Sequence, residues 1–134
     1  MIRIAIVEDE QLFREKILRY LHRYEEKNKQ SFSIKTFENG MQFLTDYRPE
    51  YDIIFMDIEM PYLSGMETAK RIRKVDSRTA IAFITNMANY AVQGYEVEAI
   101  DFIVKPFTYE VFEYKLGRIL SRTEDKREKS SIIV

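Results

Sequence analysis

The sequence contains no cysteine and only one histidine among its 134 residues. Without cysteine the chain has no disulfide, no thiolate nucleophile and no cysteine-ligated metal. Because His22 is the only imidazole, a transition-metal site built from His and Cys ligands is excluded as well. These absences are compatible with a reducing compartment.

Long apolar runs and an excess of one charge are also missing. No stretch is apolar enough to cross a bilayer, and the acidic start MIRIAIVEDE is unlike a signal peptide, so we expect a cytoplasmic protein that does not bind membranes. The formal net charge of -1 gives no general attraction to nucleic acid. The hydrophobic content of 46% is enough for the core of one domain.

Short apolar runs alternate with longer amphipathic ones. Residues 2–7, 32–37, 52–56, 80–84 and 99–104 are typical of buried strands. Apolar side chains at helical spacing fill most of the intervals and the end of the chain: Phe13, Ile17, Leu21 and Tyr24; Met41, Leu44 and Tyr47; Met66, Ala69 and Ile72; Val111, Tyr114, Leu116 and Leu120. Strands that alternate with helices predict an α/β fold with a doubly wound, five-stranded parallel sheet.

Polar side chains stand where four of these strands end. Glu8 and Asp9 follow the first strand, Asp57 the third, Thr85 the fourth and Lys105 the fifth. The carboxyl ends of parallel strands meet at one edge of the sheet. Three carboxylates gathered there repel one another, and Mg2+, which prefers oxygen ligands, would compensate their charge. The sequence therefore predicts a magnesium site at this edge.

The apolar run IIFM (53–56) leads directly into Asp57 and presents its carboxylate at the same edge. The Thr85 hydroxyl and the Lys105 ammonium are expected beside it. A metal, a hydroxyl and a positive charge together are what a transferring phosphoryl group requires. We therefore predict that Asp57 is a nucleophile that forms an aspartyl phosphate.

The stretches VEDE, MDIEMPYLSG, FITN and FIVKPF resemble the receiver domain of two-component response regulators, over residues 2 to about 122. The resemblance implies a flavodoxin-like fold with strand order 2-1-3-4-5. It also implies that Asp57 accepts a phosphoryl group from a histidine kinase, without being a turnover enzyme. Glu8 and Asp9 would be the acidic pair that holds Mg2+, and Glu59 would lend the metal its backbone carbonyl.

The same resemblance implies a switch. Thr85 would move toward the phosphoryl group, Lys105 would pair with it, and Phe102 would be the aromatic residue that rotates. Pro106 would follow a cis peptide bond. In receivers, the helix after the fourth strand and the fifth strand commonly form a dimer or partner surface, so the resemblance also implies a homodimer formed on phosphorylation through this face. The mixture of apolar and acidic residues in segment 89–107 suits such a regulated interface.

Segment 89–107 also resembles receivers that precede LytTR-type DNA-binding domains. We predict a receiver over residues 1–122, followed by a charged linker and the start of a missing output domain over 123–134. The run SSIIV at 130–134 is interpreted as the opening of a strand. DNA binding and control of transcription would belong to the missing domain.

Two other functions compete with this interpretation. A phosphatase of the haloacid dehalogenase type also uses an Asp nucleophile and Mg2+, but it needs Asp-x-Asp, whereas this chain has Asp57-Ile58-Glu59. A flavin-binding module would need a phosphate loop after the first strand, where EDEQLF (8–13) would repel phosphate. The basic run KRIRK (70–74) is interpreted as a solvated helix face.

Overall fold

The computed structural model describes residues 1–86 and 96–133, and of residues 124–133 it describes the backbone alone. Five parallel strands form one sheet in the order β2-β1-β3-β4-β5. The strands are β1 (Ile2–Val7), β2 (Phe32–Phe37), β3 (Ile53–Met56), β4 (Ala80–Thr85) and β5 (Asp101–Val104). The predicted fold class and strand order are confirmed.

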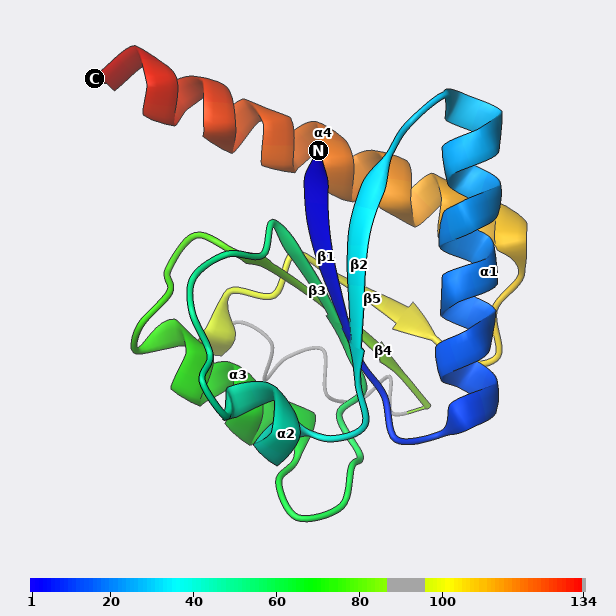
Figure 1. The fold of residues 1–134 in the computed structure, drawn as a ribbon, viewed down its shortest axis with the longest axis vertical. Helices are drawn as coiled ribbons and strands as arrows, with labels where there is room; N and C mark the ends of the chain where they lie inside the picture. Colours follow the sequence, from blue (N-terminus) through cyan, green and yellow to red (C-terminus); the bar gives the residue numbers. More distant parts are fainter. Residues whose placement is uncertain (87–95, 134) are drawn as a thin grey trace.

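Within residues 1–86 and 96–133, four helices cover the two faces of this sheet. Figure 1 shows α1 (Gln11–Asn28) and α4 (Tyr109–Ile133) on one face, and α2 (Gly40–Leu44) and α3 (Gly65–Arg73) on the other. Each pair of helices encloses its own hydrophobic cluster. Because successive side chains of a strand point to opposite faces, Ile4 and Ile6 pack beneath α1 and α4, whereas Ala5 and Val7 pack beneath α2 and α3. This explains why the central strands are apolar at nearly every position.

Helix α3 begins at a defined capping residue. The Ser64 hydroxyl accepts a hydrogen bond from the backbone N–H of Glu67 at 3.1 Å, which satisfies one of the free N–H groups of the first turn. The backbone N–H of Gly65 donates to the carbonyl of Ile58 at 2.7 Å. The start of α3 is thereby attached to the segment that follows β3.

Helix α4 differs from the sequence prediction in two respects. Val111 and Tyr114 were predicted in its buried stripe, but both are exposed; the buried face contains Phe112 and Leu116. The helix also continues through Ile133, so the interpretation of residues 130–133 as a strand is wrong. Glu, Lys and Arg dominate residues 122–129 and favour helix. The boundary of the receiver near residue 122 stays a prediction.

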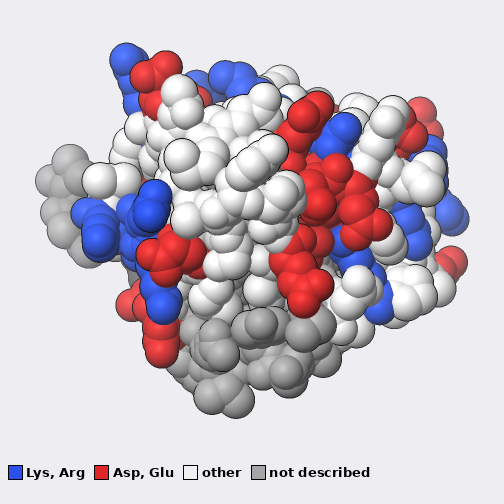
Figure 2. Space-filling view, turned by 90° about the horizontal axis from the view of Figure 1, so that it is seen from below, with Lys and Arg blue, Asp and Glu red and all other residues white. Residues whose placement is uncertain are grey.

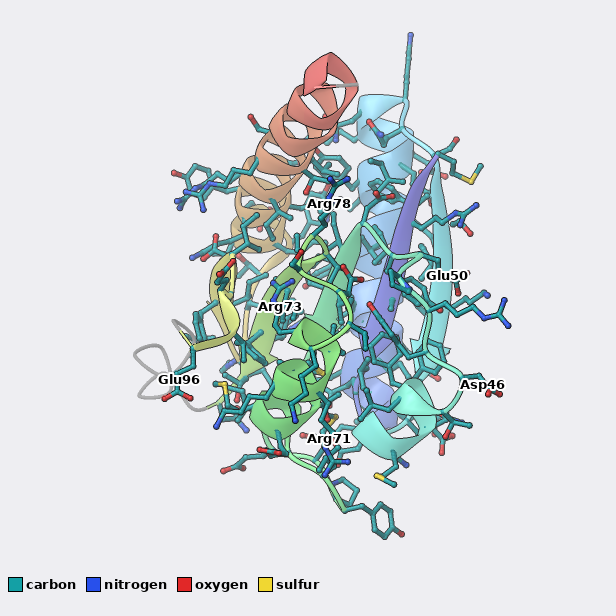
Figure 3. All side chains as sticks on the ribbon, turned by 90° about the vertical axis from the view of Figure 1, so that its left-hand side faces the viewer. Asp46, Glu50, Arg71, Arg73, Arg78 and Glu96 are labelled. Atoms are coloured by element: carbon teal, nitrogen blue, oxygen red, sulfur yellow. The ribbon has the colours of Figure 1, made fainter. Side chains whose placement is uncertain are left out.

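The helix predicted after the fourth strand, with Tyr90 and Tyr95, lies outside the described residues. The basic run 70–74 is only partly solvated, because Arg73 is half-buried. From α3 its guanidinium donates to the carbonyls of Val97 at 2.6 Å and Glu98 at 3.3 Å (Figure 3). Arg73 therefore joins α3 to the segment that leads into β5.

Within the described residues, none of the helices has both the length and the apolar character that crossing a membrane requires.

Candidate functional site

The backbone hydrogen bonds of the sheet extend past the strands and fix the residues at their carboxyl ends. The N–H of Asp57 donates to the carbonyl of Val7 at 3.1 Å, and the N–H of Lys105 donates to the carbonyl of Thr85 at 2.9 Å. The N–H of Glu8 is bonded to the end of β2 in the same way. The predicted site residues are thus held by neighbouring strands.

Three carboxylates meet at this edge. Glu8, Asp9 and Asp57 each offer an oxygen, and these oxygens all lie within 4.8 Å of one another. Glu8 is 1% exposed and Asp57 5% exposed, whereas Asp9 faces solvent. Figure 2 views the molecule from this edge and shows acidic side chains grouped on it. The group fits Mg2+, which is held in proteins by one or two carboxylates while it keeps several waters.

Lys105 supplies the positive charge. Its side chain is fully buried, with Nζ 3.0 Å from Asp57 Oδ2 and 2.5 Å from Glu8 Oε1. Burial alone would lower the pKa of Lys105, but the bonds and charges of Glu8 and Asp57 outweigh it and raise that pKa. The ammonium therefore stays charged inside the site.

The pKa of Glu8 is also raised, but for a carboxyl group this favours the neutral form. Burial raises its pKa to about 8, against the opposing hydrogen bond from Lys105, and the Asp57 charge raises it further. An ionised Glu8 is therefore costly in the protein alone. A divalent cation beside the three carboxylates would favour the ionised form, so the electrostatics of this site are suited to binding one.

The remaining predicted residues lie in the segment after β3, on β4, and on or just after β5. The backbone N–H of Glu59 donates to Asp57 Oδ1 at 3.3 Å, and the Glu59 side chain is exposed; contact of its carbonyl with a metal stays a prediction. Thr85 is buried at the end of β4. Phe102 is half-buried, with its ring centroid 5.4 Å from that of Phe83. The peptide bond between Lys105 and Pro106 is cis, as predicted.

The structure adds residues that the sequence reasoning missed. A Cβ at Gly65 would lie 1.9 Å from the carbonyl oxygen of Asp57, so only glycine fits there. The Phe13 ring lies with its centroid 4.1 Å from Lys105 Nζ, and Glu10 Oε1 lies 3.6 Å from the same nitrogen. The Ser-Gly pair at the start of a helix was a usable signal for Gly65. The helical spacing placed Phe13 in the apolar stripe of the first helix but gave no sign of its contact with Lys105.

A parallel sheet of this order, with a buried Asp, an acidic group and a Lys at adjoining strand ends, has the architecture of a signalling receiver. The chain matches the family described as "Response regulator receiver domain" over residues 4–116, and it belongs to that family. Receiver domains are signalling modules, and the match gives no support to the haloacid dehalogenase alternative.

Relatives refine this assignment. The chain is 37% identical over 130 residues to "Sensory transduction protein LytT" of Oceanobacillus iheyensis, covering 94% of this chain and 51% of that protein. It therefore resembles the regulators of the LytTR subgroup, as predicted, and it spans about half the length of the curated relatives it matches.

Two solved structures show the same fold. The response regulatory domain of protein mrkE from Klebsiella pneumoniae has a TM-score of 0.79 and 28% identity, covering 92% of this chain and 99% of that one. The response regulator protein TrrA from Thermotoga maritima, solved in complex with Mg(2+)-BeF, has a TM-score of 0.71 and 32% identity, covering 89% and 99%.

Proposed function

We propose that this receiver accepts a phosphoryl group from a sensor histidine kinase on Asp57, in a reaction that requires Mg2+. The main support is the position of the Asp57 carboxylate, at the end of a buried strand between an acidic group and a buried ammonium 3.0 Å away. A histidine kinase is the donor that belongs with a receiver domain.

In this reaction a carboxylate oxygen of Asp57 attacks phosphorus, and the bond from phosphorus to the kinase imidazole nitrogen breaks, with the electron pair remaining on that nitrogen. Lys105 is already placed against Asp57 and would pair with a phosphoryl oxygen, where negative charge accumulates. Mg2+ bound by Glu8, Asp9, Asp57 and the Glu59 carbonyl would supply further charge neutralisation.

The switch would follow from the same geometry. Thr85 is buried at the end of β4, the strand that pairs with β3 and so lies next to the one that leads into Asp57; we expect its hydroxyl to move toward the phosphoryl oxygens. Phe102 on β5 pairs with Phe83 on β4 and is only half-buried; we propose that its ring rotates inward once Thr85 moves. The resulting change in the shape of the β5 surface would pass the phosphorylation signal to a binding partner.

That surface is suited to a homodimer. Val104 on β5 is 47% exposed, and Tyr114 on α4 is 65% exposed, so apolar side chains of β5 and of the helix that follows it face solvent. The helix predicted to complete the interface lies outside the described residues. We propose that phosphorylation strengthens association through this face. Sedimentation with and without Mg2+ and beryllium fluoride should show a shift to dimer. An unchanged distribution, with the fluoride bound, would refute the interface.

Control of transcription would lie in an output domain joined to residue 122 or beyond. The support is that the LytT relative is about twice as long as this chain. The receiver itself should give no sequence-specific gel shift, because its balanced charge releases few counterions from DNA. A specific shift by this chain alone would contradict the assignment.

The phosphoacceptor itself can be tested by intact mass after treatment with acetyl phosphate and Mg2+. The wild type should gain one phosphoryl group, and Asp57→Asn should gain none. Asp52→Asn is the matched control, because Asp52 lies at the opposite end of β3 and bonds the N–H of Arg3. That variant should be labelled as the wild type is. Full labelling of Asp57→Asn would refute the proposal.

A further inference from the structure

The ammonium of Lys105 has an aromatic neighbour as well as acidic ones. The Phe13 ring, on the first turn of α1, lies with its centroid 4.1 Å from Nζ, well within cation–π distance. The Lys105 side chain is 0% exposed, so little water competes with this contact. Phe13 is itself fixed by stacking on Phe107, with the ring centroids 6.4 Å apart.

Three carboxylates compete for the same ammonium. Two of them, Glu8 and Asp57, belong to the buried site, at 2.5 Å and 3.0 Å. The third is Glu10, whose Oε1 is 3.6 Å away and whose side chain is 52% exposed. A full ion pair with Glu10 would draw Lys105 toward solvent, away from the oxygen that receives the phosphoryl group.

We propose that Phe13 is a positioning residue: it keeps the Lys105 ammonium next to the Asp57 carboxylate and prevents the ammonium from shifting toward the Glu10 carboxylate. The inference rests on the proposed function. An aromatic face attracts the cation without neutralising it, so Lys105 stays fixed in place and still available to a phosphoryl oxygen. A carboxylate in the position of the ring would instead compete with that oxygen for the ammonium.

The first experiment compares rates of Asp57 labelling by limiting acetyl phosphate with Mg2+. Phe13→Leu keeps the apolar volume and removes the ring, and its rate should fall by about 5- to 30-fold, the range that a desolvated cation–π contact allows. Phe13→Tyr retains the aromatic face and should stay near the wild-type rate. Tyr20→Leu is the matched control, because Tyr20 also packs on Phe107, at 5.8 Å, and should label normally.

A double-mutant cycle separates this role from simple packing. In the Glu10→Gln background the competing charge is gone, so the loss caused by Phe13→Leu should shrink to less than about threefold. A loss of equal size in both backgrounds would overturn the proposal, and so would a wild-type rate for Phe13→Leu. Thermal unfolding of each variant checks that the fold is intact.

A second measurement does not depend on phosphorylation. The ring current of Phe13 should shift the ε-methylene protons of Lys105 upfield in the NMR spectrum, in a signal identified by its loss in Lys105→Arg. An ordinary shift for that signal would overturn the inference even if Asp57 is labelled. If the wild type is not labelled at all, the proposed function fails, and the upfield shift alone decides whether Phe13 holds Lys105.

Discussion

Replacing Gly65 by alanine should damage both the stability and the site of this receiver. The added Cβ would lie 1.9 Å from the carbonyl oxygen of Asp57 and 2.9 Å from Cα of Ile58. Both contacts are with backbone, so no side chain can rotate away. Relief of this clash requires a shift of roughly 1 Å between the start of α3 and Asp57.

The magnitude follows from two effects. Overpacking of a tight interior typically costs 1–3 kcal/mol, so about 2 kcal/mol is expected for this clash. Moving the start of α3 away from Asp57 would also weaken the 2.7 Å hydrogen bond from Gly65 N–H to the Ile58 carbonyl. The loss of this bond adds about 1 kcal/mol to the destabilisation. Gly65→Ala should therefore lower the free energy of unfolding by about 3 kcal/mol, a large share of the total for a domain of this size.

Urea denaturation followed by circular dichroism measures this loss, with Gly117→Ala as the control. A Cβ at Gly117 would have only the Tyr24 hydroxyl nearby, at 3.9 Å, and alanine is the better helix former, so this variant should gain about 0.5–1 kcal/mol. The same substitution thus changes sign between two helices. If Gly65→Ala unfolds at the wild-type urea concentration, the close approach of α3 to Asp57 is wrong.

Arg73→Lys should lower the free energy of unfolding, measured by urea denaturation, by about 1–3 kcal/mol, because a lysine cannot reproduce the guanidinium bond to the Val97 carbonyl together with its other carbonyl contacts. An unchanged urea midpoint would contradict these contacts. Burial, reinforced by the bond to Asp76, raises the pKa of Tyr47, so the unfolded chain loses this proton first and stability falls as pH rises above about 10. Above this pH, the free energy of unfolding of the wild type should fall relative to that of Tyr47→Phe by up to about 1.4 kcal/mol per pH unit. If the free energies of unfolding of the two proteins change in parallel with pH, this prediction is refuted. Mg2+ should raise the melting temperature of the wild type but not that of Asp9→Asn, and equal shifts would exclude Asp9 as a ligand.

The strand-end residues could be predicted because topology alone places them. Once strands and helices alternate, the carboxyl ends of the parallel strands must share an edge, which brings Glu8, Asp57 and Lys105 together whatever the details of packing. Phe13 could not be placed in this way. Its position over Lys105 depends on how α1 is rotated about its own axis, and one apolar residue on a helix looks like any other in the sequence.

The errors have physical causes as well. Residues 130–134 contain three β-branched residues, which favoured a strand, but the preceding charged run has high helix propensity and the helix continues through Ile133. Val111 and Tyr114 fitted a helical stripe, yet the helix buries Phe112 instead. Arg73 was grouped with its solvated neighbours, because its bonds to residues 97–98 exist only in the folded chain.

The most direct test of the phosphoacceptor locates the phosphoryl group on the wild-type chain, without any substitution. After acetyl phosphate and Mg2+, borohydride reduces an aspartyl phosphate to homoserine, and tandem mass spectrometry of the peptides identifies the altered residue. We predict homoserine at position 57 and nowhere else, and none when Mg2+ is chelated before the donor is added. Homoserine at another aspartate, or an unmodified Asp57 in protein that has gained a phosphoryl group, would contradict the assignment of Asp57 as the phosphoacceptor.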